Sequence, residues 1–286
     1  MRLLVDVGNS RLKWAFCAPG ERIAPNETPL GTPDELLPLL QSAIVPDEIR
    51  LSNVAGADVG SRVAGQLERK FGLKPIIAAS ARQGAGVTNG YLQPLQLGTD
   101  RCLAICAAYD RYQSAVWVVD AGTATTIDHV TRAGEHRGGL ILPGIGLMQS
   151  VLFHKTGDLA RLAGIDLPQG TVPGPLLPPA VAPMDGLAML PAGLGRDTAT
   201  AIRAGALQAT ATTILHHLQE GDEVIAGVDA ARLVLTGGMG ATLQAMLSHI
   251  WSSSRRREDR DLSLEYRPQL VLEGLALDPP CFVTAP

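Results

Sequence analysis

Apolar and polar residues follow each other along the chain in patterns that predict strands and helices in turn. Residues 2–7 form an apolar, β-prone run that breaks at a Gly-Asn-Ser turn and resumes over residues 12–17, which predicts a β-hairpin. Strand-like runs at residues 49–54 and 75–79 bracket an amphipathic segment at residues 59–71. This strand, helix, strand order is typical of an α/β domain.

The pattern begins again near the middle of the chain. Residues 115–120 have the composition of a buried strand, residues 125–130 that of a return strand and residues 139–142 that of a third strand. Later elements are also indicated. They are a long helix at about residues 197–220, a strand at residues 232–236 and a helix that ends near residue 251.

The two hairpin regions share one motif. Val5-Asp6-x-Gly8 aligns with Val119-Asp120-x-Gly122, with an offset of 114 residues between the two aspartates. An internal repeat is the natural explanation. Because 286 residues are enough for two separate cores, the chain is predicted to contain two domains, residues 1–113 and 114–286.

Composition and charge narrow the class of protein. Hydrophobic residues make up 46% and charged residues 18%, with no apolar run long enough to span a bilayer, so we expect a protein without a membrane partner. The net charge of −4 makes nucleic acid an unlikely partner overall. An acid and a glycine come too early at the N-terminus for a secretory signal.

The four cysteines show no disulfide framework, which fits a reduced cytoplasm best. Cys102 and Cys106 are one helical turn apart. A pair at this spacing could be half of a metal site, but no further ligands stand at zinc-like spacing. Buried core thiols are the favoured interpretation.

Each hairpin turn carries the residues of a phosphate-binding loop. A loop of the form Asp-x-Gly-(Asn/Thr) presents backbone N–H groups to an anion, and its glycine allows close approach. The strand-end aspartate would repel phosphate, so it makes sense chiefly as a cation ligand. One copy alone fits a plain hairpin, whereas two copies favour a cleft that grips a triphosphate from both sides. No P-loop or dinucleotide-binding motif is present, and an ATP-dependent small-molecule kinase is therefore predicted.

A third motif, Gly98-Thr99-Asp100-Arg101, stands at the start of a helix predicted over residues 100–109. Thr99 is a plausible N-cap. Asp100 can accept the proton of an attacking hydroxyl, and Arg101 offers a planar fork to a carboxylate or amide. The alternatives are that Asp100 only caps the helix, or that Asp100 and Arg101 form a surface ion pair.

Taken jointly, these motifs resemble the type III pantothenate kinase family of the actin, sugar kinase and Hsp70 superfamily. The resemblance covers nearly the whole chain, and the Gly-x-Asp-Arg block separates this family from other kinases of the superfamily. It rests on residues 6–13, 91–101, 120–126, 138–144 and 195–198. It implies an α/β fold of two ribonuclease-H-like (actin-like ATPase) domains with mixed sheets flanked by helices.

The resemblance also implies an activity, the ATP-dependent phosphorylation of pantothenate to 4'-phosphopantothenate in coenzyme A biosynthesis. Asp100 would be the general base on the primary hydroxyl of pantothenate. Asp6 would position Mg2+, and Asp120 would bind a monovalent cation, K+ or NH4+. A cytoplasmic homodimer is expected.

The remaining predicted contacts fall into two groups. The residues expected to contact ATP are Asp6, Val7, Gly8, Asn9, Ser10, Arg11, Leu12, Lys13 and Thr123. The residues expected to contact pantothenate are Tyr91, Gly98, Thr99, Asp100, Arg101 and Thr198, the last across a dimer interface. Three of them have simpler alternatives: Lys13 as a solvated strand lysine, Tyr91 as a packing aromatic and Thr198 as a helix N-cap.

Two features depart from the family pattern. Cys102 stands where an aromatic residue is usual, and a segment with seven prolines, residues 166–195, is longer than usual. Neither removes a catalytic group.

Two other functions stay open. One is a regulatory accessory factor that acts with a transcription regulator, the role behind the Bvg accessory factor label, for which residues 255–257 (Arg-Arg-Arg) are the only support. The other is a sugar kinase of the same superfamily. A protein without catalysis would be free to lose Asp6, Asp100, Arg101 and Asp120, and all four are present.

Overall fold

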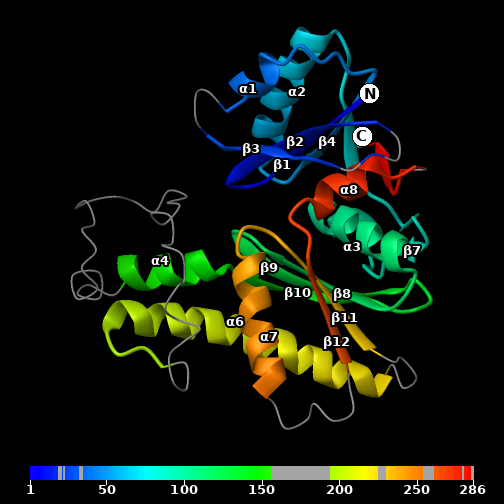
Figure 1. The fold of residues 1–286 in the computed structure, drawn as a ribbon. Coiled ribbons are helices and arrows are strands. Elements are labelled where there is room, and N and C mark those ends of the chain that lie inside the picture. Colours follow the sequence, from blue (N-terminus) through cyan, green and yellow to red (C-terminus); the bar gives the residue numbers. More distant parts are fainter. Residues whose placement is uncertain are drawn as a thin grey trace. The chain divides into compact units, whose positions relative to one another are not determined.

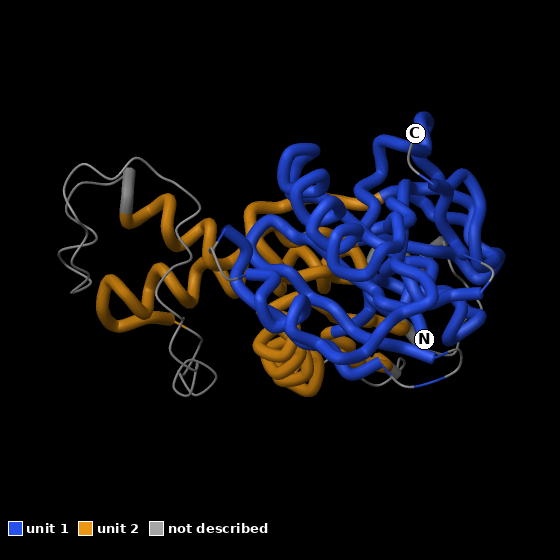
Figure 2. The backbone as a smooth tube through the Cα atoms, turned by 90° about the horizontal axis from the view of Figure 1, so that it is seen from above, with its two compact units in different colours: residues 1–118, 128–138, 269–286 blue, residues 119–127, 139–268 orange. Residues whose placement is uncertain are grey.

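The computed structural model describes most of the chain, in two compact units (Figures 1 and 2). The described residues are 1–18, 21, 23–31, 35–155, 194–224, 230–253, 261–278 and 280–284. Unit 1 comprises residues 1–118, 128–138 and 269–286, and unit 2 comprises residues 119–127 and 139–268. The predicted domains 1–113 and 114–286 stay a prediction. Residues 166–193 of the proline-rich segment and Arg255–Arg257 lie outside the described residues.

Unit 1 is built on a six-stranded mixed sheet with the order β13-β5-β4-β1-β2-β3. Its strands are β1 (Arg2–Val7), β2 (Arg11–Cys17), β3 (Asn26–Pro29), β4 (Glu48–Asn53), β5 (Ile76–Ser80) and β13 (Phe282–Thr284). Its helices are α1 (Leu37–Leu40), α2 (Ala57–Phe71), α3 (Thr99–Tyr112) and α8 (Leu270–Ala276), with a 3-10 turn at Pro94–Gln96. A separate short hairpin joins β6 (Gln83–Gly84) to β7 (Val87–Thr88).

Alternation along β1 gives the central strand two different faces. Leu3, Val5 and Val7 are fully buried in a core that also holds Val63 and Leu67 of α2. Because successive side chains of a strand point to opposite faces, the residues between these three point away from that core. Figure 1 shows α2 on one side of the sheet, with α3 and α8 on the other.

The strand pairing places three polar residues together on the second face. β1 pairs antiparallel with β2 and parallel with β4, so Asp6 lies opposite Lys13 and beside Ser52. Directly paired residues project from the same face of a sheet. The strand register therefore assembles a polar group at the carboxyl end of β1.

The C-terminal segment completes unit 1. β13 pairs antiparallel with β5, and α8 packs against α3 and β1. The packing of α8 on α3 is close because Gly274 faces the backbone of Leu103, where a Cβ would collide with the Leu103 carbonyl. Residues far apart in the sequence thus share one core.

Unit 2 is built around a five-stranded sheet with the order β10-β9-β8-β11-β12. The strands are β8 (Val116–Ala121), β9 (Ala124–Val130), β10 (His136–Pro143), β11 (Ala230–Thr236) and β12 (Asp261–Tyr266). Residues 116–118, 128–130 and 136–138 of these strands are grouped with unit 1. The helices are α4 (Ile145–Lys155), α6 (Thr198–Val224) and α7 (Gly240–Ser253). α4 packs against α6, and α7 packs against β11 and β12.

The predicted fold class is confirmed as α/β with mixed sheets and flanking helices. Both predicted hairpins and the helices at residues 59–71 and 100–109 are present, with bounds shifted by a few residues. The elements that the sequence pattern did not predict include β3, β6, β7, the 3-10 turn at Pro94–Gln96, α4, β12, α8 and β13. All four cysteines are buried free thiols, which confirms their interpretation as core residues.

In the part of the chain that the structure describes, no helix combines the length and the apolar character that crossing a membrane requires.

The α3–α8 contact generates a stability prediction. Gly274→Ala should destabilise the protein by about 1–3 kcal/mol, because the new methyl group would push α8 away from the Leu103 backbone. Gly65→Ala, in α2, is the matched control, since the nearest atom to its new Cβ is the flexible end of Arg69 at 3.6 Å. The control should gain about 0.4–1 kcal/mol. Urea unfolding measures both, and equal stability of the two variants would contradict the prediction.

Candidate functional site

The first predicted phosphate loop is a tight turn at the end of β1. The Gly8 N–H donates to the Arg11 carbonyl at 3.0 Å, and the Leu30 N–H donates to the Ser10 carbonyl at 3.0 Å. A Cβ on Gly8 would lie 3.2 Å from the Arg11 oxygen, so glycine suits this close turn. Asn9, at the tip, is exposed. The loop is well placed to offer backbone and short polar groups to an anion.

Asp6 is buried at the base of this loop, with 9% of its surface exposed. Its strand neighbour Lys13 is half-buried, which does not fit a fully solvated strand lysine. Arg11 instead forms an exposed ion pair with Glu27 of β3. Mg2+ is usually held by one or two carboxylates together with substrate phosphates, and one buried carboxylate beside a phosphate loop fits that donor set.

The second loop, in unit 2, is similar but shorter. Two residues, Gly122 and Thr123, connect β8 to β9, and the Gly122 N–H donates to the Ala124 carbonyl at 3.0 Å. The Thr123 carbonyl accepts from Gly144 at 3.0 Å, which ties the turn to the end of β10. The two hairpin turns are therefore related but not identical in length.

Asp120, at the end of β8, lies against the Gly-Gly turn that follows β11. Gly237 has φ +81°, and a Cβ there would collide with Asp120 Oδ1. The Met239 N–H donates to the Ala121 carbonyl at 3.0 Å, which holds the two strand ends together. Glycine is thus required at residue 237 both by its backbone conformation and by the approach of the Asp120 carboxylate.

The predicted acceptor site, in unit 1, is a hydrogen-bonded network around Arg101. Its guanidinium donates from Nε to Asp128 Oδ2 at 2.9 Å and from Nη2 to Asp128 Oδ1 at 2.7 Å. It donates from Nη1 to the Tyr91 hydroxyl at 2.8 Å. His136 Nε2 lies 2.9 Å from Asp128 Oδ1. The rings of Tyr91 and His136 stack, with centroids 6.0 Å apart.

The network corrects one expectation about Arg101. The residue is 6% exposed and its carboxylate partner is Asp128, so a surface pair with Asp100 is wrong. Burial disfavours the charged form, but the hydrogen bonds and charge of Asp128, with smaller contributions from Tyr91, raise the pKa of Arg101 above its ordinary value. Arg101 is therefore a permanent buried cation.

Hydrogen bonds fix both the side chain and the backbone of Tyr91. Its hydroxyl meets Arg101, and its N–H donates to Asn89 Oδ1 at 3.0 Å. Arg82 donates to the Tyr91 carbonyl at 3.1 Å. The residue packs against His136 and also makes directed polar contacts, so packing is only part of its role.

Asp100 stands in the first turn of α3. The helix N-cap is Gly98, without a side-chain cap, so the prediction that Thr99 caps this helix is wrong. Asp100 Oδ1 instead accepts from the Arg101 backbone N–H at 2.8 Å. Asp100 therefore does interact with the helix start, while its carboxylate remains a candidate base.

The pKa of Asp100 is raised above the ordinary aspartate value. Burial is the largest cause and the charge of Asp128 adds to it, while the backbone hydrogen bond and charge of Arg101 act in the opposite direction. A raised pKa makes a carboxylate a stronger proton acceptor, which suits a general base.

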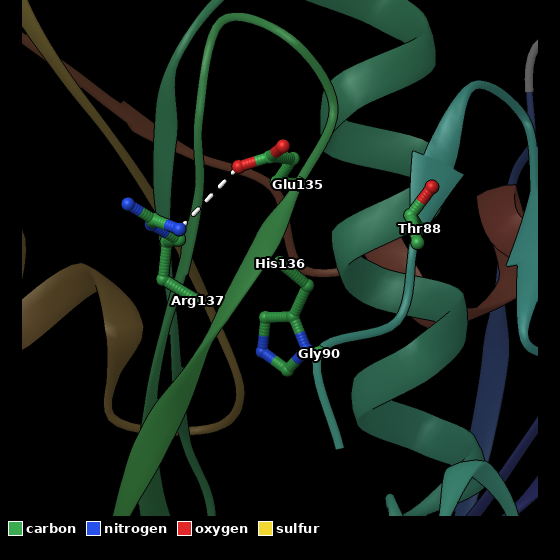
Figure 3. Close-up of a pocket in the computed structure, with 5 residues that line it drawn as sticks. All are labelled: Thr88, Gly90, Glu135, His136 and Arg137. Carbon is green, nitrogen blue, oxygen red and sulfur yellow. Dashed lines mark hydrogen bonds and ion pairs between the residues drawn. The ribbon is translucent and has the colours of Figure 1, made fainter. Parts of the chain in front are cut away.

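A hollow of about 470 Å³ adjoins the network (Figure 3). It is lined by Thr88, Gly90, Glu135, His136 and Arg137. Figure 3 shows the His136 ring beside Gly90, and the dashed line marks the ion pair between Glu135, which precedes β10, and Arg137 of β10. A Cβ on Gly90 would collide with the His136 carbonyl, so these two segments are in close contact.

Thr198 is the first residue of α6 in unit 2. Asp197 caps this helix: its Oδ1 accepts from the Thr200 N–H at 2.8 Å, and Thr200 Oγ1 accepts from the Asp197 N–H at 3.3 Å. This reciprocal pair is a capping box, so the alternative that Thr198 is the N-cap is wrong. The predicted substrate contact of Thr198 stays a prediction.

Sequence reasoning missed Asp128 and His136. A carboxylate inside a β-prone strand, Thr-Thr-Ile-Asp-His-Val, was the available signal, because a charge that is buried needs a partner. The partner could not be named, since Arg101 lies 27 residues away. Among the described residues, no group of three or more His, Cys, Asp or Glu could hold a metal ion.

Comparisons with known proteins agree on one family. A family model described as type III pantothenate kinase matches residues 2–220. A protein of Azoarcus sp. (strain BH72) named type III pantothenate kinase is 34% identical over 97% of this chain and 90% of its own. A protein of the same name from Halorhodospira halophila is 35% identical over 96% of each chain.

One solved structure supports the fold alone. It comes from Campylobacter jejuni and is assigned to the Baf family of transcriptional activators. It is 20% identical, covers 96% of this chain and 94% of its own, and has a TM-score of 0.51.

The raised pKa of Asp100 generates a prediction about stability. The folded state disfavours the ionised carboxylate of Asp100. Ionisation of Asp100 therefore lowers the stability of the wild type near neutral pH, whereas below the ordinary aspartate pKa of 3.8 the side chain is protonated and this cost is absent. Asp100→Asn should therefore be more stable than the wild type at about pH 7, provided that the raised pKa of Asp100 lies below this pH, with a difference that shrinks as the pH falls through that raised pKa and is lost below 3.8. Thermal unfolding across this range measures it. A variant that is less stable than the wild type at every pH would contradict it.

Proposed function

Because the chain belongs to the type III pantothenate kinase family, we propose that it transfers the γ-phosphoryl group of ATP to pantothenate, the first step of coenzyme A biosynthesis. The observation that carries this proposal is the largely buried Asp100, whose pKa is raised, one residue before the Arg101 network. This arrangement suits proton removal from a primary hydroxyl.

Asp100 is the general base of the proposed reaction. It takes the proton of the pantothenate hydroxyl as that oxygen forms a bond to the γ-phosphorus, and the bond to the ADP oxygen breaks. Arg101 and Tyr91 hold the acceptor, and Gly98 and Thr99 border it at the start of α3. Positioning and charge stabilisation supply most of the catalysis in phosphoryl transfer.

The loop from Asp6 to Lys13 is assigned to ATP. The backbone of Val7 to Ser10 faces the phosphates, Asn9 supplies a short polar side chain, and Lys13 supplies a cation beside Asp6. Arg11 and Leu12 continue the loop into β2. Asp6 would hold Mg2+, which would neutralise charge on the phosphates.

Asp120 and Thr123 are assigned to a second, separate role. Asp120 would bind a monovalent cation, K+ or NH4+, beside Gly237, where any Cβ would collide with its carboxylate, and Thr123 would contact ATP. Turnover that is unchanged when potassium salts are replaced by tetramethylammonium salts would contradict the cation assignment.

We further propose a homodimer. Two large apolar side chains of α4, Leu147 and Val151, are 44% and 48% exposed and stand one helical turn apart, and Ile141 of β10, the strand that precedes α4, is 65% exposed. Such exposed apolar side chains favour burial against a second copy. Sedimentation that gives the mass of one 30.0 kDa chain would contradict the dimer.

A reduced cytosol is the proposed location, because the four cysteines are free thiols. A regulatory accessory role is not favoured, so we propose no regulatory protein partner. A sugar acceptor is the remaining competitor, and the assay below includes it.

The activity prediction uses one catalytic variant and one matched control. Coupled ADP release should require pantothenate, Mg2+ and K+, and Asp100→Asn should lower kcat by about 10²–10⁴-fold while ATP still binds. Asp110→Asn, an exposed aspartate of the same helix, should keep wild-type turnover. Turnover with hexoses alone, or an Asp100→Asn variant with near wild-type kcat, would overturn the proposal.

A further inference from the structure

We infer that Asp128 and His136 are positioning residues of the acceptor site, which set the orientation of Arg101 and Tyr91 toward the substrate. The inference rests on the proposed function and adds two residues to it. Neither is expected to touch the reacting atoms. Both would act through residues that face the acceptor.

Asp128 fixes the guanidinium of Arg101 along one edge. A bidentate contact through Nε and Nη2 allows one orientation of the planar group, and both partners are buried. An arginine has five N–H donors. Asp128 and Tyr91 use three of them among the described residues, which leaves two for oxygen atoms of a substrate.

Asp128 also balances charge beside the proposed base. Arg101 follows Asp100 directly in the sequence, and an uncompensated cation there would favour the ionised form of Asp100 and weaken it as a base. The charge of Asp128 acts on Asp100 in the opposite sense to the charge of Arg101. A substrate-binding cation and a basic carboxylate can therefore stand next to each other.

His136 contacts both Asp128 and Tyr91. Its ring is fully buried, its Nε2 bonds Asp128 and its face stacks on Tyr91. A carboxylate acceptor at Nε2 assigns the hydrogen to that nitrogen, which leaves Nδ1 as an acceptor. Nδ1 is buried without a hydrogen-bond partner among the described residues.

The Nδ1 atom of His136 helps to distinguish a hydrogen-bonding role of this side chain from a role in packing alone. A phenylalanine at residue 136 would fill similar space and stack on Tyr91 without burying an unsatisfied polar atom. Histidine carries that cost and contributes one thing phenylalanine lacks, the bond to Asp128. The hydrogen bond is therefore the feature that the side chain supplies.

Two substitutions at residue 136 separate these roles. His136→Gln keeps a donor near the position of Nε2, whereas His136→Phe keeps the stacking surface and loses the donor. We expect the pantothenate KM of His136→Phe to rise by about tenfold or more, with the ATP KM within about twofold of wild type, because misplaced contacts act on the acceptor alone. His136→Gln should recover most of the loss. Asp128→Asn should behave like His136→Phe.

His249→Phe, at an exposed histidine of α7, is the control and should leave every constant unchanged. Thermal unfolding of each variant reports whether it folds. If His136→Phe does not fold, Asp128→Asn, which keeps the size of the side chain and removes its charge and one acceptor from the bonds to Arg101 and His136, tests the same network and should raise the pantothenate KM.

The outcomes are distinguishable. A wild type that phosphorylates pantothenate, with variants whose KM values are unchanged, overturns the positioning roles and leaves the proposed function standing. Equal rises in the KM values for ATP and pantothenate, or equal losses in the Gln and Phe variants, would show a structural role only and also overturn the inference. A wild type inactive on pantothenate removes both the proposed function and the inference.

Discussion

The buried ion pair between Arg101 of α3 and Asp128 of β9 is the interaction on which the acceptor site depends. Removal of two charges from water is costly, and the attraction between them compensates only where the remaining donors and acceptors are also satisfied. Asp128 meets this condition with two bonds from Arg101 and one from His136. Because Arg101 lies in the first turn of α3, the same pair holds in place the helix start that carries Asp100. The proposed base and its neighbouring cation are thus positioned by one contact.

Both hairpins have a glycine turn directly after a strand that ends near an aspartate, but the two aspartates have different neighbours. The turn after β1 has three residues and places Asp6 beside Lys13, which suits phosphates and a divalent cation. The turn after β8 has two residues, and its aspartate lies against Gly237 rather than beside a lysine. The electrostatic surroundings of the two carboxylates therefore differ, although their sequence motifs match. The matching sequence motifs therefore stand in turns of different length and in different local surroundings.

Burial serves stability and function in different ways within unit 1. The aliphatic side chains of β1 and α2 form a core in which every buried atom favours folding. Asp100, in contrast, is a carboxylate whose burial disfavours its charged form. Functional sites commonly retain such costs, which the surrounding core offsets. The C-terminal helix α8 contributes to that core by packing on the helix that carries Asp100.

Features that depend on neighbours in the sequence could be predicted from the sequence alone. The hairpin at Gly8, the hairpin at Gly122 and the amphipathic helix at residues 59–71 are set by turn chemistry and periodicity, which act over a few residues. The motif residues from Asp6 to Lys13 and from Tyr91 to Arg101 were also recognisable. Which carboxylate pairs with Arg101 was decided only by the tertiary structure, because the partner stands 27 residues away on another element. The same holds for the stacking of His136 on Tyr91 and for the return of residues 269–286 to unit 1. A sequence pattern reports local geometry, whereas the pairing of buried charges depends on which segments the fold brings together.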